Sequence, residues 1–377
     1  MGREKMRFSV LTEKGHAEVR ERKLPEIGTH QVLVKQLACN ICTTDYGQWL
    51  GLREHQGYPM AGGHEGSGVI EAVGEGVKDY KVGDFVAIAY DGCGECLACR
   101  KGDVLHCSNA ASMKAKTEDG YLGGFGFADY FVRNTRSLIK MNPKLDPSEA
   151  AFLEPLATVV KGMKKLRVKP LETVAVIGAG TMGLVNALAA RALGARVIVS
   201  EIMEKKINTA KEMGFEVIDA GKENPIEKVK ELTDGIGADA VIIAVGASSA
   251  NKQAFEMVKD MDGRILFFAA GYPAPELEID SNVIHYRRLE MIGTYAADTI
   301  DFFTAGEMLN SGAVDVSKIV EPVKYKLDDV QEAFKAAATP GMYRVSVLLT
   351  EERLCCLSLM IYIPGKGLSL ISGSPFG

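Results

Sequence analysis

The sequence predicts an α/β protein of two domains, the first rich in short strands and the second built on a doubly wound parallel sheet. The chain has 377 residues, whereas a single hydrophobic core rarely grows beyond about 250–300 residues. Short strand patterns separated by glycine turns fill much of residues 1–150. From about residue 173 onward, apolar runs alternate with helical segments, which is typical of βα units around a parallel sheet.

Composition and charge exclude several classes of partner. Hydrophobic residues make up 47% and charged residues 25% of the chain, as in an ordinary globular protein. The net charge of −5 argues against a surface for nucleic acid or anionic membrane. No apolar run approaches the roughly 20 residues that span a bilayer, and the charged residues 1–10 do not resemble a signal peptide. We expect a cytoplasmic protein without nucleic-acid or membrane partners.

A glycine-rich turn follows the first strand of the predicted parallel sheet. The apolar run 174–177 leads into Gly178-x-Gly180-x-x-Gly183. The first glycine permits a tight turn, the second lets a pyrophosphate approach the backbone, and the third lets the helix pack closely on the strand. The helix N-terminus would hold the pyrophosphate. The alternative is a tight strand–helix turn in a fold that binds no nucleotide.

An acid at the end of the next apolar run bears on which dinucleotide would bind. Glu201 would accept from a ribose hydroxyl and repel a 2′-phosphate, which favours NAD. Lys205 and Lys206 follow closely and would soften that repulsion. The residues expected to bind the cofactor are Gly178, Ala179, Gly180, Thr181, Met182, Gly183, Glu201, Lys206, Val245 and Gly246.

Four cysteines form a compact cluster within a glycine-rich and polar stretch, about 91–108. Cys93, Cys96 and Cys99 are separated by two residues each, and Cys107 follows closely. Four thiolates can surround one ion in the closed tetrahedral pattern of structural zinc. The alternatives are disulfides, spare thiols or an iron–sulfur cluster. In a reducing compartment the spacing favours zinc.

A second group of metal-competent residues lies nearer the N-terminus. Cys42 and Thr44 directly follow the strand predicted over residues 31–38, a place where functional residues often lie. His64 and Glu65 follow within a glycine-rich turn. Cys39 fits a small buried residue on the strand better than a ligand.

The remaining segments complete the predicted organisation. A helix over 149–165 carries Glu154, and residues 301–350 hold two helices and a final strand. We expect domains at 1–155 with 295–350 and at 156–294. Residues 351–377 are apolar and show neither a helical nor a clean strand period. They would form an oligomer contact or a flap, but we favour a reading-frame or cloning artefact.

These motifs together resemble the zinc-dependent medium-chain alcohol dehydrogenases, in their polyol (sorbitol) and threonine dehydrogenase-like branch. The residues 63–77 are similar to that family's zinc signature, and 40–45 to its Gly-Ile-Cys-Gly-Thr-Asp segment. The resemblance covers about residues 8–350 and implies a GroES-like catalytic domain beside a Rossmann domain. It also implies that Cys42 and His64 bind a catalytic zinc.

Other site residues follow from the same resemblance. It implies that Glu65 is a ligand or lies close to the ion, and that Glu154 supplies the carboxylate typical of polyol and threonine enzymes. Thr44 would take the alcohol proton. Gly47 stands where many members have a histidine that passes the proton outward. His55 is one substitute for that relay, although a plain surface histidine is the better interpretation.

The expected function is a zinc-dependent oxidoreductase that transfers a hydride between a secondary alcohol, a polyol or sugar alcohol, and NAD. Each chain would hold one catalytic and one structural zinc, and the chains would form a homodimer or homotetramer. The alternatives are an enzyme like L-threonine 3-dehydrogenase, a simple secondary-alcohol dehydrogenase, and a non-catalytic nucleotide-binding relative.

Overall fold

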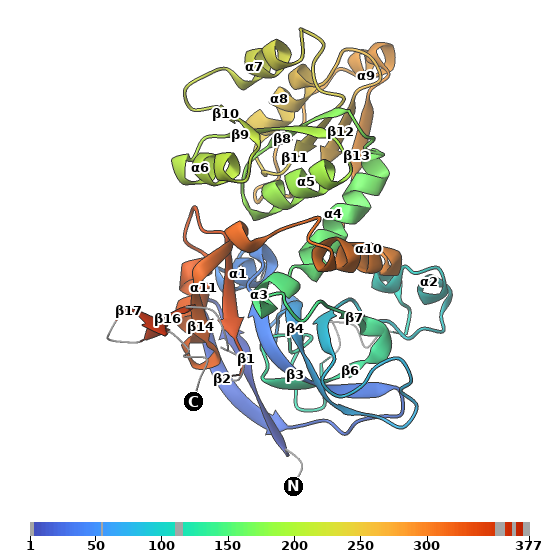
Figure 1. The fold of residues 1–377 in the computed structure, drawn as a ribbon, viewed down its shortest axis with the longest axis vertical. Coiled ribbons are helices and arrows are strands. Elements are labelled where there is room, and N and C mark those ends of the chain that lie inside the picture. Colours follow the sequence, from blue (N-terminus) through green and yellow to red (C-terminus); the bar gives the residue numbers. More distant parts are fainter. Residues whose placement is uncertain (1–3, 54–55, 110–115, 351–358, 364–366, 372–377) are drawn as a thin grey trace. The chain divides into compact units, whose positions relative to one another are not determined.

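The computed structural model describes residues 4–53, 56–109, 116–350, 359–363 and 367–371 (Figure 1). The chain divides into two compact units. Unit 1 comprises Met1–Glu154, Asp298–Asn310 and Val320–Gly377, and unit 2 comprises Pro155–Ala297 and Ser311–Ile319. The segment 311–319 therefore groups with unit 2, although the sequence led us to expect it in the first domain.

Unit 2 is built on a parallel sheet that has six strands in the described residues, in the order β10-β9-β8-β11-β12-β13. Its strands are short apolar runs whose residues are mostly buried, as expected where helices cover both faces of a parallel sheet. The order reverses between β8 and β11, so the loops that follow these strands lie at a topological switch point. The strands are β8 Thr173–Ile177, β9 Arg196–Glu201, β10 Glu216–Asp219, β11 Ala240–Ile243, β12 Arg264–Phe267 and β13 Glu290–Gly293.

The helices of unit 2 follow the strands along the chain, which confirms the predicted doubly wound sheet. Short loops join α5, α6, α7 and α8 to the strands before them, whereas residues 268–280 separate β12 from α9. The sequence did not predict α9, which has only seven residues. The helices are α5 Thr181–Ala192, α6 Glu204–Glu212, α7 Pro225–Leu232, α8 Ser248–Met257 and α9 Ser281–Arg287.

Unit 1 is mostly β. A hairpin of β1 (Lys5–Glu13) and β2 (His16–Lys23) accompanies a larger sheet, whose described strands follow the order β17-β16-β14-β15-β3-β4-β5-β7, with β6 paired to β3. β3 carries the longest run of buried residues and pairs with β4, β6 and β15. The further strands are β3 Gln31–Asn40, β4 Glu65–Val73, β5 Phe85–Ile88, β6 Tyr130–Asn134, β7 Leu138–Lys140, β14 Val320–Lys326 and β15 Arg344–Leu348.

The helices of unit 1 differ in places from those predicted. The helix expected over 149–165 is divided into α3 (Pro147–Ala150) in unit 1 and α4 (Leu153–Leu166), whose residues from Pro155 onward belong to unit 2. Pro155 lies in the first turn of α4, where its missing N–H costs no hydrogen bond, so it favours a helix that starts just before it. The remaining helices are α1 Thr43–Trp49, α2 Leu97–Arg100, α10 Thr299–Asn310 and α11 Val330–Ala337.

The C-terminal segment forms two described strands, although its sequence shows no clean strand period. β16 (Leu359–Ile363) runs parallel to β14, and β17 (Gly367–Ile371) pairs antiparallel with β16. The segment 359–363 is apolar at every position, so it lacks the alternation that marks a strand with one wet face.

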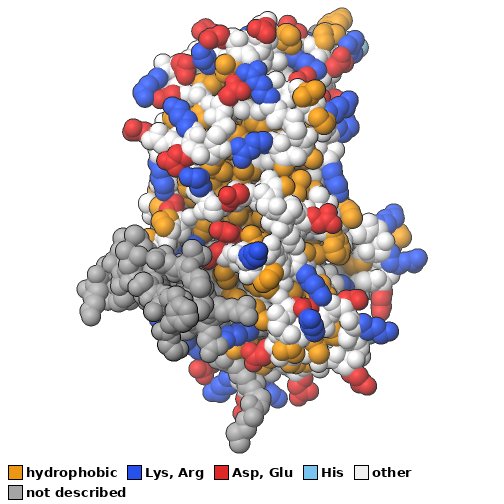
Figure 2. All heavy atoms as spheres, in the orientation of Figure 1, with side chains coloured by type: hydrophobic (Ala, Val, Ile, Leu, Met, Phe, Trp, Pro, Cys, Tyr) orange, Lys and Arg blue, Asp and Glu red, His pale blue; other side chains and the backbone are white. Residues whose placement is uncertain are grey.

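The surface and helices agree with the composition. Basic and acidic side chains are interspersed over the face shown in Figure 2. Within the part of the chain that the structure describes, every helix is too short or too polar to cross a bilayer.

One charged side chain is buried in the sheet of unit 1. Lys324 of β14 lies opposite Ser346 of β15, and only 5% of its surface is exposed. Burial lowers the pKa of Lys324 to about 8, although the charges of Asp146, Glu149 and Glu321 act in the opposite direction. The folded protein therefore bears a free-energy cost for the ammonium form.

Replacing Lys324 tests this cost. The pKa lies about 2.5 units below its ordinary value of 10.5, which corresponds to about 3 kcal/mol. The cost is fully present below pH 8 and disappears as the pH rises toward 10.5, because the unfolded chain then holds a proton that the folded chain has released. We expect Lys324→Met to raise the unfolding free energy in urea at pH 7 by up to that amount.

The gain should shrink as the pH approaches 10.5. Lys326→Met, at an exposed position of the same strand, is the control and should change little at either pH. A constant gain between pH 7 and 10.5 would contradict the explanation.

Candidate functional site

The glycine-rich turn of unit 2 has the geometry of a phosphate-binding loop. Gly178 has a φ of +101°, and a Cβ there would lie 2.4 Å from Val245. A Cβ at Gly183 would lie 1.9 Å from the carbonyl oxygen of Gly178, so α5 packs too closely for any side chain there. At Gly180, the N-cap of α5, a Cβ would meet only Lys206 Nζ, at 3.8 Å. Open space thus lies at the helix N-terminus beside a cation, as an anion requires.

The other predicted nucleotide-binding residues surround this turn. Glu201 is buried at the end of β9; its Oε2 accepts from the Ala179 N–H at 2.7 Å, and its Oε1 accepts from two further backbone N–H groups. Glu201 therefore ties the glycine-rich turn to the end of β9. Thr181 and Met182 form the first turn of α5, and Val245 and Gly246 follow β11.

The four cysteines of unit 1 form one donor set. Their sulfur atoms all lie within 4.8 Å of one another. The Cys93–Cys99 and Cys96–Cys107 sulfurs are 4.0 Å and 3.9 Å apart, close to the roughly 3.8 Å edge of a tetrahedron with Zn–S bonds of about 2.3 Å. A disulfide would need about 2.05 Å, and all four cysteines are free. We infer one structural ion here.

Backbone donors prepare these sulfurs for a cation. The N–H groups of Glu95 and Cys96 donate to Cys93 Sγ, and the Cys93 N–H donates to Cys107 Sγ at 3.3 Å. Backbone donation from Cys99 and Ser108 lowers the pKa of Cys96 to about 6. The thiolate form that a metal requires is therefore favoured at Cys96, and the pKa of Cys107 is also lowered, whereas burial raises the pKa of Cys99 to about 12.

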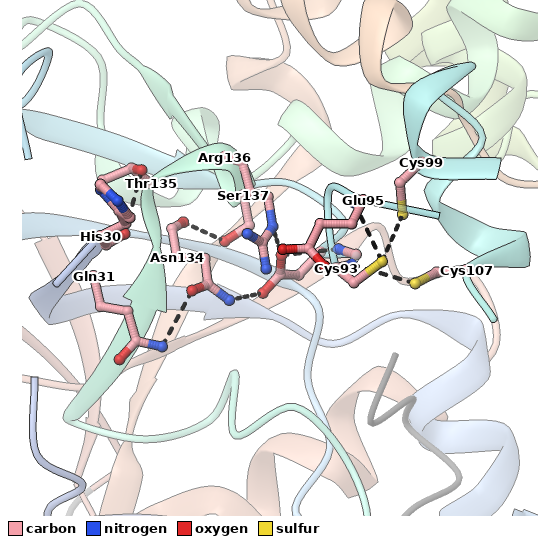
Figure 3. A network of polar contacts seen from close by, with 12 residues as sticks. His30, Gln31, Cys93, Glu95, Cys99, Cys107, Asn134, Thr135, Arg136 and Ser137 are labelled. Atoms are coloured by element: carbon pink, nitrogen blue, oxygen red, sulfur yellow. Dashed lines mark hydrogen bonds and ion pairs between the residues drawn. The ribbon is translucent and has the colours of Figure 1, made fainter. Parts of the chain in front are cut away.

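Asp91 ties the cysteine lobe to the sheet through Asn134 and Arg136, which Figure 3 shows beside the cysteines. Its carboxylate accepts from the Gly92 N–H, from Asn134 Nδ2 and from Arg136 Nε, at 2.8, 2.5 and 3.0 Å. Asn134 in turn accepts from Gln31 Nε2 on β3. The described helices of the lobe, α2 and the 3₁₀ turn at Val104–His106, contain no buried residue, so polar contacts and an ion must replace a hydrophobic core.

The second donor set joins three of the residues chosen from the sequence. Ligand atoms of Cys42, His64 and Glu65 lie within 4.8 Å of one another. Cys42 follows β3 and is the N-cap of α1, His64 precedes β4, and Glu65 opens β4 opposite Asn40. Adjacent strands therefore bring the donors together. A thiolate, an imidazole and a carboxylate form a donor set that suits zinc.

Asp45 supports this set, although the sequence alone indicated no role for it. Its Oδ2 accepts from the Cys42 N–H at 2.9 Å, and its Oδ1 lies 3.7 Å from His64 Nδ1. Asp45 lies in the first turn of α1, three residues after the N-cap. This capping position is the feature of the sequence that could have indicated its role. A carboxylate next to a metal-binding imidazole fixes the ring and raises its basicity.

Arg344 is the second residue that the sequence did not indicate. Its Nη2 donates to Glu65 Oε1 at 2.7 Å, and both side chains are buried. Burial opposes ionisation of Cys42, but the charge of Arg344 and a hydrogen bond from His64 lower the pKa of the thiol to about 7. Burial raises the pKa of Glu65 well above its usual range, against the charge of Arg344. Among the described residues, Glu65 Oε2 is buried without a hydrogen-bond partner, so one oxygen is left for a cation.

Glu154 lies beside this set and not within it. It occupies the first turn of α4, is 6% exposed, and accepts a very short hydrogen bond from the Tyr90 hydroxyl. Burial lowers the pKa of the His64 imidazole, but the charge of Asp45, the contact with Cys42 and, as the smallest of these effects, the charge of Glu154 raise it well above its usual value. Glu154 therefore influences this donor set through its charge, although it is not one of the three donors.

The remaining predicted residues have these places. Thr44 lies in the first turn of α1 and is half-buried. A Cβ at Gly47 would lie 3.5 Å from the Arg53 side chain, so an arginine occupies the space beside this position. Cys39 is fully buried in the core. His55 falls outside the described residues.

Comparisons with known proteins agree with these sites. Residues 28–143 match the family described as the alcohol dehydrogenase GroES-like domain, and residues 181–311 match the family described as zinc-binding dehydrogenase. A sorbitol dehydrogenase of Halalkalibacterium halodurans is 31% identical, over 89% of this chain and 96% of its own length. An L-threonine 3-dehydrogenase of Pyrococcus horikoshii is 33% identical, over 88% and 95%.

Solved structures agree in fold. A zinc-binding dehydrogenase from Sinorhizobium meliloti bound to NADP is 27% identical with a TM-score of 0.79, covering 92% of this chain and 100% of that one. The chain belongs to the zinc-dependent medium-chain alcohol dehydrogenase family. It is an oxidoreductase of the GroES-like and Rossmann type, with zinc and a nicotinamide dinucleotide as its cofactors and a small-molecule alcohol as substrate. The predicted family, fold class and cofactors are thereby confirmed.

The buried ion pair offers a test of how the site is stabilised. Replacing Arg344 by Met leaves the Glu65 carboxylate buried without its cation, and breaking such a pair costs about 3–5 kcal/mol. We expect Arg344→Met to lower the unfolding free energy of the metal-free protein by that amount in urea titrations.

The double variant Glu65→Leu/Arg344→Met should recover most of the loss, since no unpaired charge remains. A double variant no more stable than Arg344→Met would contradict the role given to the pair.

Proposed function

We propose that the protein oxidises and reduces a secondary alcohol of a polyol or sugar alcohol, with the hydride exchanged with NAD. The observation that carries the alcohol chemistry of this proposal is the donor set of Cys42, His64 and Glu65 with the further carboxylate of Glu154 next to it. A zinc ion held there would supply a Lewis acid for the alcohol oxygen. The buried, unpartnered Oε2 of Glu65 supports the fit of such an ion.

The chain's own residues would hold the donors and move the proton. Asp45 positions the His64 ring and the Cys42 backbone. The half-buried Thr44 hydroxyl can accept the alcohol proton and donate its own onward, because a hydroxyl is both donor and acceptor. The Arg53 side chain, which has hydrogen-bond donors and no acceptor, lies beside Gly47, so the next step outward goes through water or the cofactor ribose.

NAD is the cofactor we propose over its 2′-phosphorylated form. The Glu201 carboxylate lies at the end of β9, next to the glycine-rich turn, where it would accept from a ribose hydroxyl and repel a phosphate. Lys206 lies near Gly180, a position that suits the pyrophosphate.

Two relatives point to the substrate classes. The sorbitol dehydrogenase supports a polyol, and the L-threonine 3-dehydrogenase supports an amino alcohol as the second candidate. Both classes present a secondary alcohol next to other polar groups. The carboxylate-rich donor set is common to both resemblances, so the donor set alone does not separate them.

We also propose that the chains form a homodimer or homotetramer. We further propose that the protein is located in a reducing compartment, the cytoplasm. The described cysteines are free, and those of the two donor sets suit metal binding over disulfides. Light scattering on the purified protein measures the assembly, and a monomer would contradict it.

Metal analysis tests the candidate metal centres. We expect two zinc ions per chain, and Cys42→Ala should lose one of them and reduce kcat by at least about 1000-fold, since the residual protein lacks a Lewis acid. Cys39→Ala is the matched control, because this buried cysteine belongs to the core and should leave both ions in place. An active Cys42→Ala protein would refute the assignment.

A substrate panel tests the proposed chemistry. Reduction of NAD should be fastest with polyols such as sorbitol, slower with simple secondary alcohols, and slow with threonine. The same panel with the phosphorylated cofactor should give a lower kcat/KM. Preference for threonine would favour the second candidate, and equal use of both cofactors would overturn the preference for NAD.

A further inference from the structure

Tyr90 makes a contact that neither the sequence motifs nor the family resemblance assigned. It lies two residues after β5, and its hydroxyl donates to Glu154 Oε1 in a very short hydrogen bond. Its ring packs edge-on against Phe302 of α10, with 4.9 Å between ring centroids and 72° between ring planes. The phenol is therefore fixed by its ring as well as by its hydroxyl.

The burial of Glu154 makes this contact consequential. Only 6% of the Glu154 surface is exposed, and a buried carboxylate needs charge-assisted partners. Glu154 also acts electrostatically on His64, Glu65 and Arg344. Its position relative to the three donors depends on what holds the carboxylate, and Tyr90 holds one of its two oxygens.

We propose that Tyr90 is a positioning residue of the catalytic metal centre, which orients Glu154 toward the donor set of Cys42, His64 and Glu65. The hydroxyl engages Oε1 and thereby fixes the position of the carboxylate. This role deepens the proposed function and rests on it. Tyr90 would act like the residues that hold metal ligands in place from outside the coordination shell. Loss of such a residue typically costs 10–100-fold in metal affinity.

Tyr90→Phe tests the hydrogen bond with little change in packing, because the ring can keep its contact with Phe302. We expect zinc at the catalytic site to dissociate about 10–100-fold more readily in chelator competition. The visible absorption bands of the cobalt-substituted protein should shift, kcat should fall more than KM rises, and the thermal midpoint should change little.

Two further variants separate the hydrogen bond from packing. Phe302→Leu removes the edge contact and keeps the hydroxyl, so its zinc affinity should stay within about threefold of the parent. In the Glu154→Ala background, Tyr90→Phe should have no further effect, since the two residues act as one unit.

Different results would overturn the role of Tyr90 and the proposed function. Unchanged zinc affinity and cobalt bands in Tyr90→Phe would overturn the role of Tyr90. So would an equal loss in Phe302→Leu, or an undiminished effect in the Glu154→Ala background. A parent protein with zinc in the cysteine lobe alone would instead overturn the proposed function.

Discussion

The burial of charge beneath the candidate catalytic centre is the constraint on which the rest of unit 1 depends. The three donors of this centre are ionisable, yet Glu65 is buried within a sheet. Removing such a group from water is expensive unless an opposite charge and hydrogen bonds accompany it. Arg344 meets that requirement from β15, on the other side of β3, and it also favours the thiolate of Cys42. The order β15-β3-β4 is what brings these groups together.

The four-cysteine donor set lies in a lobe that has no hydrophobic core within its described residues. The cysteine lobe has little apolar surface to bury, since its described short helices contribute no buried residue. Backbone N–H groups directed at the sulfurs and the Asp91 contacts supply local order. One chain thus places a metal-competent cluster inside a sheet and another in a lobe without a core. Packing and the buried Arg344 hold the cluster in the sheet. The four cysteines themselves hold the cluster in the lobe.

Residues with unusual chemistry were predictable from the sequence, whereas their supporting partners were not. Gly178, Gly183 and the cysteine cluster have spacings that few other structures require, and the doubly wound sheet follows from the alternating apolar runs. Asp45 and Tyr90 belong to common residue types, and their roles arise from contacts that the local pattern does not encode. The division of the helix expected over 149–165 shows the same limit, because periodicity locates a helix better than it locates the helix ends.

The position of β15 has a consequence for how the protein is made. This strand lies between β14 and β3 in the sheet, although it is formed by residues 344–348. Arg344 and Glu65 are separated by 279 positions along the chain. Unit 2 is nearly continuous in sequence and can fold while the ribosome is still working. Unit 1 begins first and finishes last, so a nascent chain can complete its nucleotide-binding fold before its catalytic centre exists.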